Sequence, residues 1–369
     1  MAYAYCDHNA GSPLRPEAAE AMARALALSA NPSSVHAAGR AARRLMEDAR
    51  EQVAAAVGAA AENVVFTSGA TEALHLALEA ARGAAKSLIL SAIEHDALAE
   101  HVPHAWPGAR IAPVTREGVV DLAALGSLLD EAPKPALVAV MLANNETGVI
   151  QPIARVAALV REQGGLLLVD AAQALGRIAI DIAALDATYL VLSSHKAGGP
   201  QGAGALVLAP GAPFRIAKGG GGQERGRRPG TENIAAVAGF GAACKLADDE
   251  AARVRALRDR FEREAGVEII AQSAPRLPNT SLFAPPHLRA ETAVIAFDLA
   301  GVCVSAGAAC SSGKVRKSRV LEAMGASPLA QTNAVRASFG WSSTDADVDA
   351  LLAALAQIKG RRDAGVEAA

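Results

Sequence analysis

The amino-acid sequence predicts an α/β protein built on a mostly parallel sheet, and three observations support this fold class. Short, continuous apolar runs recur along the chain, as in strands that are buried on both faces of a parallel sheet. Helical patterns separate several of these runs, which is typical of sheets with helices on both faces. Past Pro275 the pattern changes, which indicates a second, smaller domain. With 369 residues, the chain is long enough for two cores.

The expected elements follow in chain order. A helix is expected over residues 37–57, because apolar side chains recur there at helical spacing, opposite arginines and acids. A glycine-rich stretch at residues 219–222 interrupts the alternation, and a charged amphipathic helix is expected from about residue 248 to residue 264. The strands of the large sheet share a short apolar run and are expected at residues 64–66, 88–90, 137–142, 166–169, 189–192 and 205–208.

The C-terminal part is expected to form a smaller α+β domain. Residues 280–283 and 292–297 are expected to form strands, and residues 345–358 a closing helix. We place a large domain at residues 14–250 and the small domain at residues 1–13 and 251–369.

Composition and charge argue against several classes of partner. Lysine and arginine number 36 against 38 aspartates and glutamates, whereas nucleic acids and anionic membranes call for a strongly basic surface. No apolar stretch reaches membrane-spanning length, and the N-terminus lacks the apolar core of a signal peptide. The four cysteines form no CxxC pattern, so we expect neither disulfides nor a metal site. Together these features favour a cytoplasmic protein.

A lysine and an aspartate follow two of the predicted strands. Asp170 comes directly after residues 166–169, with Gln173 three residues later, and Lys196 follows residues 189–192. Parallel sheets bind ligands at the carboxyl ends of their strands. A lysine that forms a Schiff base and a carboxylate that keeps a ring nitrogen protonated are the two groups that pyridoxal 5'-phosphate (PLP) needs. Taken alone, each residue is more often a surface lysine or an acidic helix cap.

Polar groups follow three further strand ends. Residues 67–72 form a small, glycine-containing turn before a helix, which suits a phosphate but also an ordinary helix cap. His95 could stack on a flat ring and move protons, although a lone histidine is more often a packed loop residue. Residues 143–148 are polar and turn-forming, and could be simply a turn. Each of these five polar strand ends has an ordinary structural explanation. All five explanations would have to be true independently, so together they are less convincing than a shared binding site.

Cys310 lies among small residues and glycines in residues 305–313. An accessible loop of this composition is where a reactive thiol belongs, whereas inert cysteines are framed by large apolar residues. Cys303 and Cys244 look like the buried, inert kind. From the pattern alone, Cys310 is equally well explained as a nucleophile or as a small spacer in a loop.

Short motifs follow one another in a fixed order along nearly the whole chain, from about Asp7 to Gly340. They lie at residues 66–72, 94–95, 144–148, 170–173, 193–196, 228–231, 310–313 and 335–338. This series resembles the NifS/IscS-type cysteine desulfurases, which are fold-type I PLP enzymes of aminotransferase class V. Each motif is weak, but this many in order are highly specific. The resemblance implies that the small domain carries the nucleophile loop and a substrate-binding arginine.

The resemblance also implies how PLP would be held. Lys196 would bind PLP covalently as a Schiff base, Asp170 would pair with the pyridinium nitrogen, and Gln173 would hydrogen-bond the ring hydroxyl. His95 would stack on the ring and handle protons. The remaining residues expected around the cofactor are Ala70, Thr71, Asn145, Ser193, His195 and, from the second subunit of a homodimer, Thr231.

The implied reaction converts L-cysteine to L-alanine. Arg336, with Asn145 beside it, would hold the substrate carboxylate, since a guanidinium binds carboxylates bidentately. Cys310 would attack the substrate sulfur and keep it as a persulfide, so the implied catalytic residues are Lys196, His95 and Cys310. The sulfur would then pass to an acceptor, such as an iron–sulfur scaffold protein.

Two departures from the family pattern affect the expected site. Ser194 replaces the usual glycine before the His-Lys pair, a small change that we expect to be tolerated. Basic residues at 314–319 replace the usual serine and acidic residues after Cys310. They form either a solvated helix face, which we favour, or a group that activates the Cys310 thiol or docks an acidic acceptor.

Two other functions stay open at this point. The chain could be another class V PLP enzyme, such as an aminotransferase or a selenocysteine lyase, in which Cys310 matters less. It could also be a weakly catalytic sulfur carrier or scaffold subunit that keeps the fold. The intact Lys196, Asp170, His95 and Arg336 argue against the carrier or scaffold.

Overall fold

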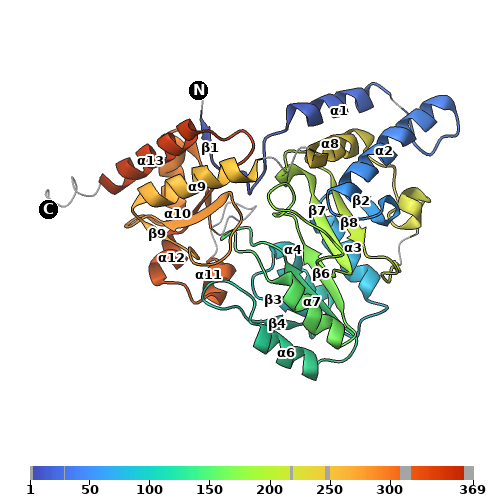
Figure 1. The fold of residues 1–369 in the computed structure, drawn as a ribbon, viewed down its shortest axis with the longest axis horizontal. Helices are drawn as coiled ribbons and strands as arrows, with labels where there is room; N and C mark the ends of the chain where they lie inside the picture. Colours follow the sequence, from blue (N-terminus) through green and yellow to red (C-terminus); the bar gives the residue numbers. More distant parts are fainter. Residues whose placement is uncertain (1–2, 29, 217–218, 246–249, 308–316, 361–369) are drawn as a thin grey trace.

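The computed structural model describes residues 3–28, 30–216, 219–245, 250–307 and 317–360. Figure 1 shows two groups of elements, a larger one around a long sheet and a smaller one that is coloured mostly from yellow to red. The smaller group also contains the N-terminal strand, so both ends of the described chain lie in this group (Figure 1).

The larger group is built on a seven-stranded sheet in the order β2-β8-β7-β6-β5-β3-β4. Neighbouring strands are parallel, except that β8 runs antiparallel to both β2 and β7. The strands are β2 (Val64–Thr67), β3 (Ser87–Ser91), β4 (Arg110–Ala112), β5 (Ala136–Met141), β6 (Leu166–Asp170), β7 (Tyr189–Ser193) and β8 (Gly204–Leu208). The predicted mostly parallel sheet is confirmed, with β4 as an additional strand that the sequence pattern did not reveal.

Helices cover both faces of this sheet (Figure 1). One face packs against α2 (Ala37–Ala55), α6 (Leu122–Glu131), α7 (Ile153–Glu162) and α8 (Ile234–Lys245). The other face packs against α3 (Ala70–Ala81), α4 (Asp96–Ala99) and α5 (Val102–Ala105), while α1 (Pro16–Leu26) packs on α8. Because both faces are covered, a central strand needs apolar residues at successive positions, and every residue of β5, β7 and β8 is buried.

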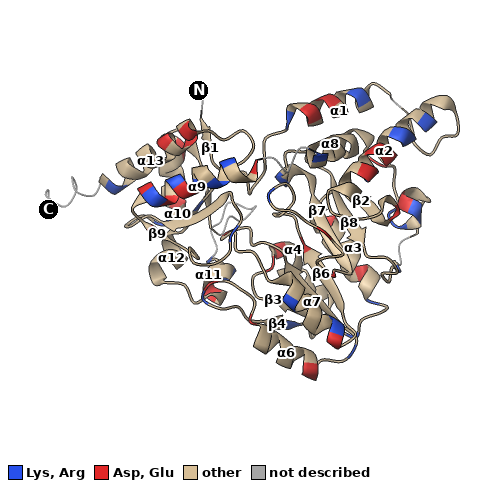
Figure 2. Ribbon diagram, viewed as in Figure 1, with Lys and Arg blue, Asp and Glu red and all other residues tan. Residues whose placement is uncertain are grey.

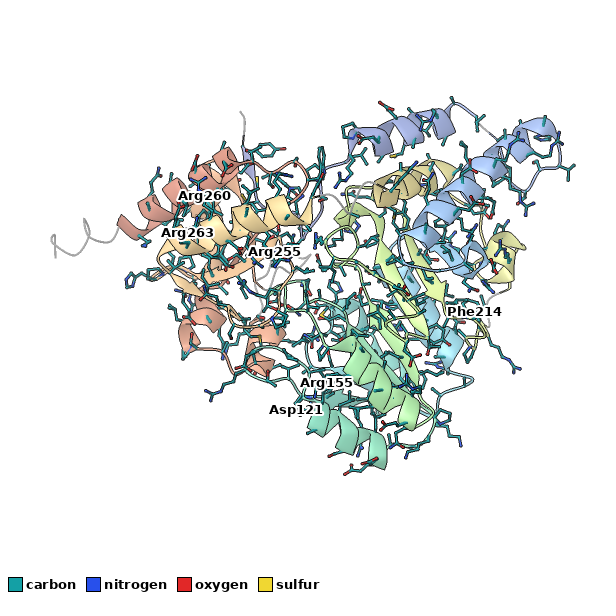
Figure 3. The ribbon with its side chains drawn as sticks, in the orientation of Figure 1. Asp121, Arg155, Phe214, Arg255, Arg260 and Arg263 are labelled. Atoms are coloured by element: carbon teal, nitrogen blue, oxygen red, sulfur yellow. The ribbon has the colours of Figure 1, made fainter. Side chains whose placement is uncertain are left out.

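The smaller group contains an antiparallel sheet in the order β12-β13-β10-β9 and a parallel pair of β1 and β11. Its strands are β1 (Ala4–Tyr5), β9 (Glu268–Ile269), β10 (Thr280–Ala284), β11 (Val302–Cys303), β12 (Ser305–Ala306) and β13 (Val335–Ser338). Its helices are α9 (Ala251–Ala265), α10 (Ala290–Leu299), α11 (Arg319–Ala323), α12 (Pro328–Asn333) and α13 (Asp345–Gly360). Charges of both signs are interspersed on α9, whereas the acidic residues of α13 gather at its start (Figure 2). Arg260, labelled in Figure 3, forms ion pairs that join these two helices.

Residues 292–297 are helical, so the strand predicted there is wrong. They belong to α10, whose buried residues Ala290, Ala293 and Phe297 recur at spacings of three and four. A strand would have buried Ala293, Ile295 and Phe297 on one face, but Ile295 is 61% exposed. The segment is apolar at nearly every position, so its sequence does not separate the period of a helix from that of a strand.

The other predicted elements are present with small shifts at their ends. The described helices α2, α9 and α13 correspond to those expected near residues 37–57, 248–264 and 345–358, and β10 to the strand at 280–283. The domain boundaries near residues 14 and 250 stay a prediction. Within the ranges that the structure describes, every helix is too short or too polar to cross a membrane.

Candidate functional site

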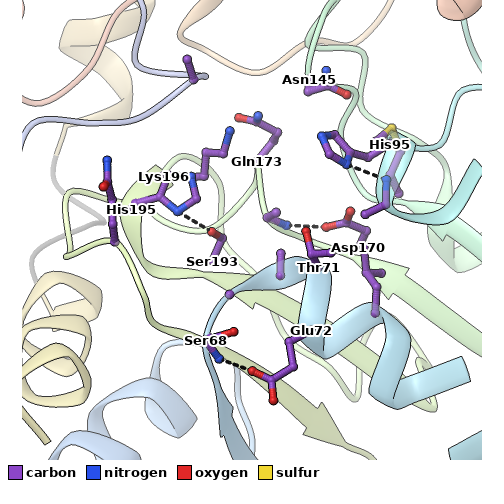
Figure 4. Close-up of a pocket in the computed structure, with 18 of the residues that line it drawn as sticks. Ser68, Thr71, Glu72, His95, Asn145, Asp170, Gln173, Ser193, His195 and Lys196 are labelled. Atoms are coloured by element: carbon purple, nitrogen blue, oxygen red, sulfur yellow. Dashed lines mark hydrogen bonds between the residues drawn. The ribbon is translucent and has the colours of Figure 1, made fainter. Parts of the chain in front are cut away.

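The carboxyl ends of the parallel strands open into a cavity of about 480 Å³ (Figure 4). Turns that follow β2, β3, β5, β6 and β7 supply its walls, as expected for a parallel sheet. The predicted site residues that line it are Ala70, Thr71, His95, Asn145, Asp170, Gln173, Ser193, His195 and Lys196. The structure therefore brings these residues together, while their individual roles remain predictions.

Lys196 lies in the short helix η2 (Ser194–Lys196), directly after β7. Its amine is buried and donates a hydrogen bond to the Asn9 backbone carbonyl. Burial and the positive charges of Arg336 and Arg177 lower the pKa of Lys196 to about 7, against the opposing effect of two nearby carboxylates. A large share of the amine is therefore uncharged near neutral pH, and the uncharged amine is the nucleophilic form.

Asp170 ends β6 and places a buried carboxylate in the same cavity (Figure 4). Its Oδ1 accepts a hydrogen bond from the Ala172 backbone N–H at 2.9 Å. Burial raises the pKa of Asp170, and the Ala172 hydrogen bond acts in the opposite direction. A cationic group placed against this carboxylate, such as a protonated ring nitrogen, would stabilise its charged form.

The turn between β2 and α3 forms one end of the cavity. Ser68, Gly69, Ala70 and Thr71 line this end at the N-terminus of α3, where free backbone N–H groups and the helix dipole favour an anion. Gly204 on β8 packs directly against the turn, since a Cβ at this position would lie 2.7 Å from the Gly69 backbone. Glycine at 204 therefore permits the close approach of β8 to the anion-binding end.

At the same end of the cavity, the negative charge of Glu72 is paired with the positive charge of Arg228. Glu72 accepts a hydrogen bond from Arg228 Nε at 2.9 Å and from the Ser68 backbone N–H at 2.6 Å. Burial acts to raise the pKa of Glu72, but these hydrogen bonds outweigh it and lower the pKa to about 2. The ion pair therefore offsets a charge that would otherwise repel an anion at the N-terminus of α3.

Ser193 and His195 add polar groups to the cavity. Ser193 Oγ and His195 Nδ1 are hydrogen-bonded at 3.0 Å (Figure 4). Burial, followed by the charge of Lys196, lowers the pKa of His195 to about 4, so its imidazole is neutral near pH 7. Ser194, between them, is buried, and its hydroxyl has no hydrogen-bond partner in the described part of the chain.

His95 and Gln173 line the cavity with side chains that are held by hydrogen bonds. His95 caps α4, because its Nδ1 accepts a hydrogen bond from the Ala97 N–H at 3.1 Å. In its neutral form His95 therefore carries its proton on Nε2. Gln173 Nε2 donates to the Asn9 carbonyl at 3.0 Å, and Gln173 Oε1 accepts from Arg177. Both side chains are thus oriented before any ligand binds.

Arg336 lies beside the cavity but is not among the residues that line it. From β13, its Nη1 donates to the Asn145 carbonyl at 3.0 Å and its Nη2 to Asp7 Oδ1 at 2.8 Å. Arg336 is only 4% exposed, and its Nε has no hydrogen-bond partner among the described residues. Asn145 and Asp7 thus use two of the five guanidinium N–H groups, and among the described residues Nε and the second N–H groups of Nη1 and Nη2 are left for a carboxylate.

Besides Arg336, two further predicted residues are not placed in the cavity by the structure. Cys310 lies outside the described residues, and Thr231 is exposed and does not line the cavity. Cys244 is buried as expected, and burial raises the pKa of its thiol. Cys303 is only partly buried, contrary to expectation. It ends β11, a two-residue strand that, among the described strands, pairs with β1 alone.

The basic segment after Cys310 is described only at its end. Lys317 is exposed, whereas Arg319 forms an ion pair with Asp96 at 2.6 Å and donates to the Glu94 carbonyl at 3.2 Å. These contacts join α11 to the start of α4, next to His95. Arg319 is thus exposed but held by specific contacts next to His95, while residues 314–316 lie outside the described ranges.

The N-terminal segment at residues 7–9 supplies contacts that the sequence did not predict. The Asn9 carbonyl accepts hydrogen bonds from Lys196 and Gln173, and Asn9 Nδ2 donates to the Asn145 carbonyl at 3.2 Å. No local sequence pattern predicts these contacts, because residues 7–9 lie far in sequence from the strand ends that they contact. Its run of polar residues after a short apolar stretch was the only available signal.

Comparison with known proteins assigns the family. The sequence profile of the family described as aminotransferase class-V matches residues 4–351. The cysteine desulfurase of Cereibacter sphaeroides is 40% identical and aligns with 97% of this chain and 96% of its own length. The chain belongs to the cysteine desulfurases of the class V aminotransferase family. The IscS-like cysteine desulfurase of Mycobacterium tuberculosis, at 36% identity over 95% of both chains, agrees with this class V assignment.

Solved structures give the same grouping. The NifS-like protein of Rickettsia africae matches with a TM-score of 0.89 at 33% identity, over 96% of this chain and 99% of its own. A second NifS-like protein matches with a TM-score of 0.87 at 31% identity, over 98% of this chain and 99% of its own. These similarities confirm the predicted type I fold of PLP-dependent transferases, and class V enzymes depend on PLP in general.

Proposed function

We propose that this protein is a PLP-dependent cysteine desulfurase that converts L-cysteine to L-alanine and carries the released sulfur as a persulfide on Cys310. The observation that carries the proposal is the cavity, which combines a buried amine, a buried carboxylate and the N-terminus of a helix at the ends of parallel strands. The relatives named above support it, since they are cysteine desulfurases.

The residues of the cavity fit PLP. A volume of about 480 Å³ is typical of a small-molecule site. Lys196 offers an amine for the aldehyde, Asp170 a carboxylate for the ring nitrogen, and the turn before α3 a set of N–H groups for the phosphate. When bound, PLP withdraws electrons from the amino-acid substrate, which acidifies its Cα proton and activates its bond to sulfur.

Lys196 and His95 are the groups that would move protons. The Lys196 amine, with a pKa of about 7, can accept the Cα proton of the substrate and return it near neutral pH. His95 is held by its Nδ1 contact to Ala97, so Nε2 is the atom that can exchange a proton with the substrate. Asp170, in its charged form, would keep a proton on the ring nitrogen.

Arg336 would bind the substrate carboxylate, with Asn145 beside it. The guanidinium is oriented by the Asn145 carbonyl and by Asp7, and one of its donors, Nε, is unpaired among the described residues. A charge-assisted bond from this donor would orient the substrate with its side chain away from Arg336. Asp7 would share the guanidinium with the substrate and so limit how tightly the carboxylate is held.

Cys310 would take up the sulfur. Its thiolate attacks the substrate sulfur, the bond between that sulfur and the substrate Cβ breaks, and the electron pair of this bond stays on Cβ, which is then protonated. One L-cysteine and one Cys310 thiol thus give one L-alanine and one Cys310 persulfide. Atoms and electrons balance without an added oxidant or reductant.

We also propose a cytoplasmic homodimer that hands the sulfur to an acceptor, such as an iron–sulfur scaffold protein. Thr231 is exposed, and Arg228, three residues earlier, pairs with Glu72 beside the anion-binding turn. The segment around Thr231 therefore lies at the surface near that end of the cavity, which supports a subunit interface there. The resemblance to the family implies that Thr231 of the partner subunit contacts the phosphate at this interface. An exposed residue is also what an interface between subunits requires.

The proposal is tested by assaying the PLP-loaded protein for alanine and, with a reductant present, sulfide from L-cysteine. We expect Cys310→Ala to abolish sulfide release and leave the cofactor absorption band, and Lys196→Ala to remove the band. Cys303→Ala is the matched control and should behave as the wild type. Sulfide release that survives Cys310→Ala would contradict the nucleophile assignment, and a keto acid in place of alanine would indicate an aminotransferase instead.

A further inference from the structure

Arg177 is a buried arginine that contacts the Lys196 backbone and that the proposed reaction does not use. Its Nη1 donates to the Gln173 carbonyl at 3.0 Å and also to Gln173 Oε1. Its Nη2 donates to the His8 carbonyl at 2.9 Å and to the Lys196 carbonyl at 3.3 Å. One guanidinium thus joins three segments of the chain, and each of them carries a residue that lines the cavity, namely Ala10, Gln173 and Lys196.

All of these acceptors are uncharged carbonyl oxygens. None of the ion pairs between described residues includes Arg177, whereas the nearby Arg336 pairs with Asp7 and Arg15 pairs with Glu250. Burial, followed by the charge of Arg336, lowers the pKa of Arg177 to about 9, so it is still a cation near neutral pH. A buried charge without a counter-charge costs stability and calls for a functional explanation.

Arg336 also lowers the pKa of Lys196, and by more than Arg177 does, but Arg336 is paired with Asp7. The other groups around Lys196 are paired, neutral or opposite in effect. Burial lowers the pKa of His195 to about 4 and that of His8 to about 3, so both are neutral near pH 7. Asp170 favours the charged form of Lys196, and Arg177 opposes it. The titratable and charged groups that line the cavities beside Lys196, act on its pKa or lie on the neighbouring N-terminal segment are Asp7, His8, Arg15, Glu72, His95, Asp170, Arg177, His195, Glu250 and Arg336.

We propose that Arg177 is a positioning residue for Lys196: it fixes the backbones of Lys196 and Gln173 against residues 8–9, and its uncompensated charge favours the uncharged form of the Lys196 amine. This inference rests on the proposed function, because the uncharged amine is the form that attacks the PLP aldehyde and accepts the substrate proton. Replacing Arg177 by a neutral residue should therefore leave more of Lys196 protonated near neutral pH.

Reductive methylation of the full-length protein, freed of cofactor, tests this effect without PLP or cysteine. Formaldehyde and a borane reductant modify only uncharged amines, and mass spectrometry compares Lys196 with the exposed Lys86 in the same sample at several pH values. For the wild type we expect the methylation of Lys196 to reach half its maximum near pH 7. For Arg177→Met we expect this midpoint to rise by about one pH unit, which makes methylation at neutral pH about fivefold slower.

Two further variants make the result decisive. Arg177→Gln is neutral but keeps amide donors for the carbonyls, so it should fold even if Arg177→Met does not, and its midpoint should shift in the same direction. Arg155→Met, on the exposed face of α7 (Figure 3), is the matched control and should keep the wild-type midpoint. A midpoint that is unchanged in the neutral variants, or a rate that falls equally at every pH, would overturn the proposed charge effect.

A second readout follows PLP itself. We expect the rate at which added PLP regenerates the cofactor absorption band to fall about fivefold in Arg177→Met near neutral pH and to recover in alkaline solution, where Lys196 is uncharged in both proteins. Failure of the proposed function would appear as no alanine from the wild type, whereas failure of this inference would appear as an unchanged methylation midpoint. The two failures are therefore distinguishable.

Discussion

Burial in the cavity is the largest cause of the shifted pKa values of Lys196 and Asp170, and neighbouring groups contribute less. Both positions could be predicted from the sequence, because each follows an apolar run that ends at the same edge of the sheet. The contacts of Asn9 and Arg177 with Gln173 and Lys196 could not be predicted, since they arise from tertiary packing that no local pattern encodes. The pairing of Arg336 with Asp7 was missed for the same reason.

Arg336→Lys tests how the substrate carboxylate is held. We expect the KM for L-cysteine to rise about ten- to hundredfold with a smaller change in kcat, because an ammonium group cannot offer the parallel donors of a guanidinium. Steady-state assays of alanine formation measure both constants, and the cofactor absorption band serves as the control for an intact site. An unchanged KM would mean that another residue binds the carboxylate.

Glu94, beside His95, gives a pH-dependent prediction for stability. Its Oε1 accepts a hydrogen bond from the Met141 N–H at 2.8 Å, its Oε2 has no partner among the described residues, and burial raises the pKa of Glu94 to about 8. The folded chain therefore binds more protons at this site than the unfolded chain between about pH 4.5 and about pH 8, so its stability falls as the pH rises through this window.

Glu94→Gln removes this titration. We expect the stability of the variant relative to the wild type to increase from about pH 5 to about pH 8, as measured by urea unfolding. If the difference in the free energy of unfolding between variant and wild type were the same at both pH values, Glu94 would not be protonated as the structure implies.

At the scale of elements, the strands of the large sheet were the most predictable, because burial on both faces demands continuous apolar runs. β4 was missed, since its three residues are too few to form a pattern and include Arg110. The sequence predicts a strand in place of α10, because apolar residues at nearly every position fit both the period of a helix and that of a strand. Whether a segment forms a helix or a strand can thus be predicted only where its apolar residues fit one of the two structures and not the other.

A buried ion pair holds the short helix η3 (Gln223–Gly226) against α2 and β2. Arg50 on α2 donates to both carboxylate oxygens of Glu224, at 2.7 and 2.8 Å, and the Phe66 N–H donates to Glu224 at 2.8 Å. The side chains of Arg50 and Glu224 are 4% and 1% exposed. Because η3 precedes the segment around Thr231, this pair anchors the chain that we expect to reach the partner subunit.

Glu224→Gln removes the buried counter-charge of Arg50 and leaves this arginine paired with the partly exposed Glu47. We expect this variant to lower the free energy of unfolding by about 3–5 kcal/mol, as measured with urea. Glu131→Gln, which breaks the exposed pair with Arg110, is the matched control and should cost less than about 1 kcal/mol. Similar losses in the two variants would show that burial does not decide the strength of the Arg50 contact.

At the scale of the whole molecule, the order of motifs predicted the family over nearly the full chain. The homodimer stays a proposal, because the surface of one chain does not identify its partner. It makes a specific prediction, since each site would combine Lys196 of one subunit with Thr231 of the other. A mixed dimer of Lys196→Ala and Thr231→Ala subunits would contain one complete site and one site that lacks both residues.

Homodimers of Thr231→Ala should bind PLP about ten- to hundredfold more weakly, because one hydrogen bond to a charged phosphate is lost. In the mixed dimer, purified with two different tags, we expect native affinity at half of the sites, as measured by titration of the cofactor absorption. If the mixed dimer binds PLP as weakly as the Thr231→Ala homodimer, the subunits do not share the site.

Transfer of sulfur to Cys310 distinguishes a desulfurase from other PLP enzymes, and mass spectrometry measures it directly. The PLP-loaded protein is mixed with isotope-labelled L-cysteine without a reductant and then digested. We expect the peptide that contains Cys310 to gain one labelled sulfur atom, together with one alanine per site, and the Cys310→Ser variant to gain none. Alanine formed with no labelled sulfur on Cys310 would contradict the proposed function.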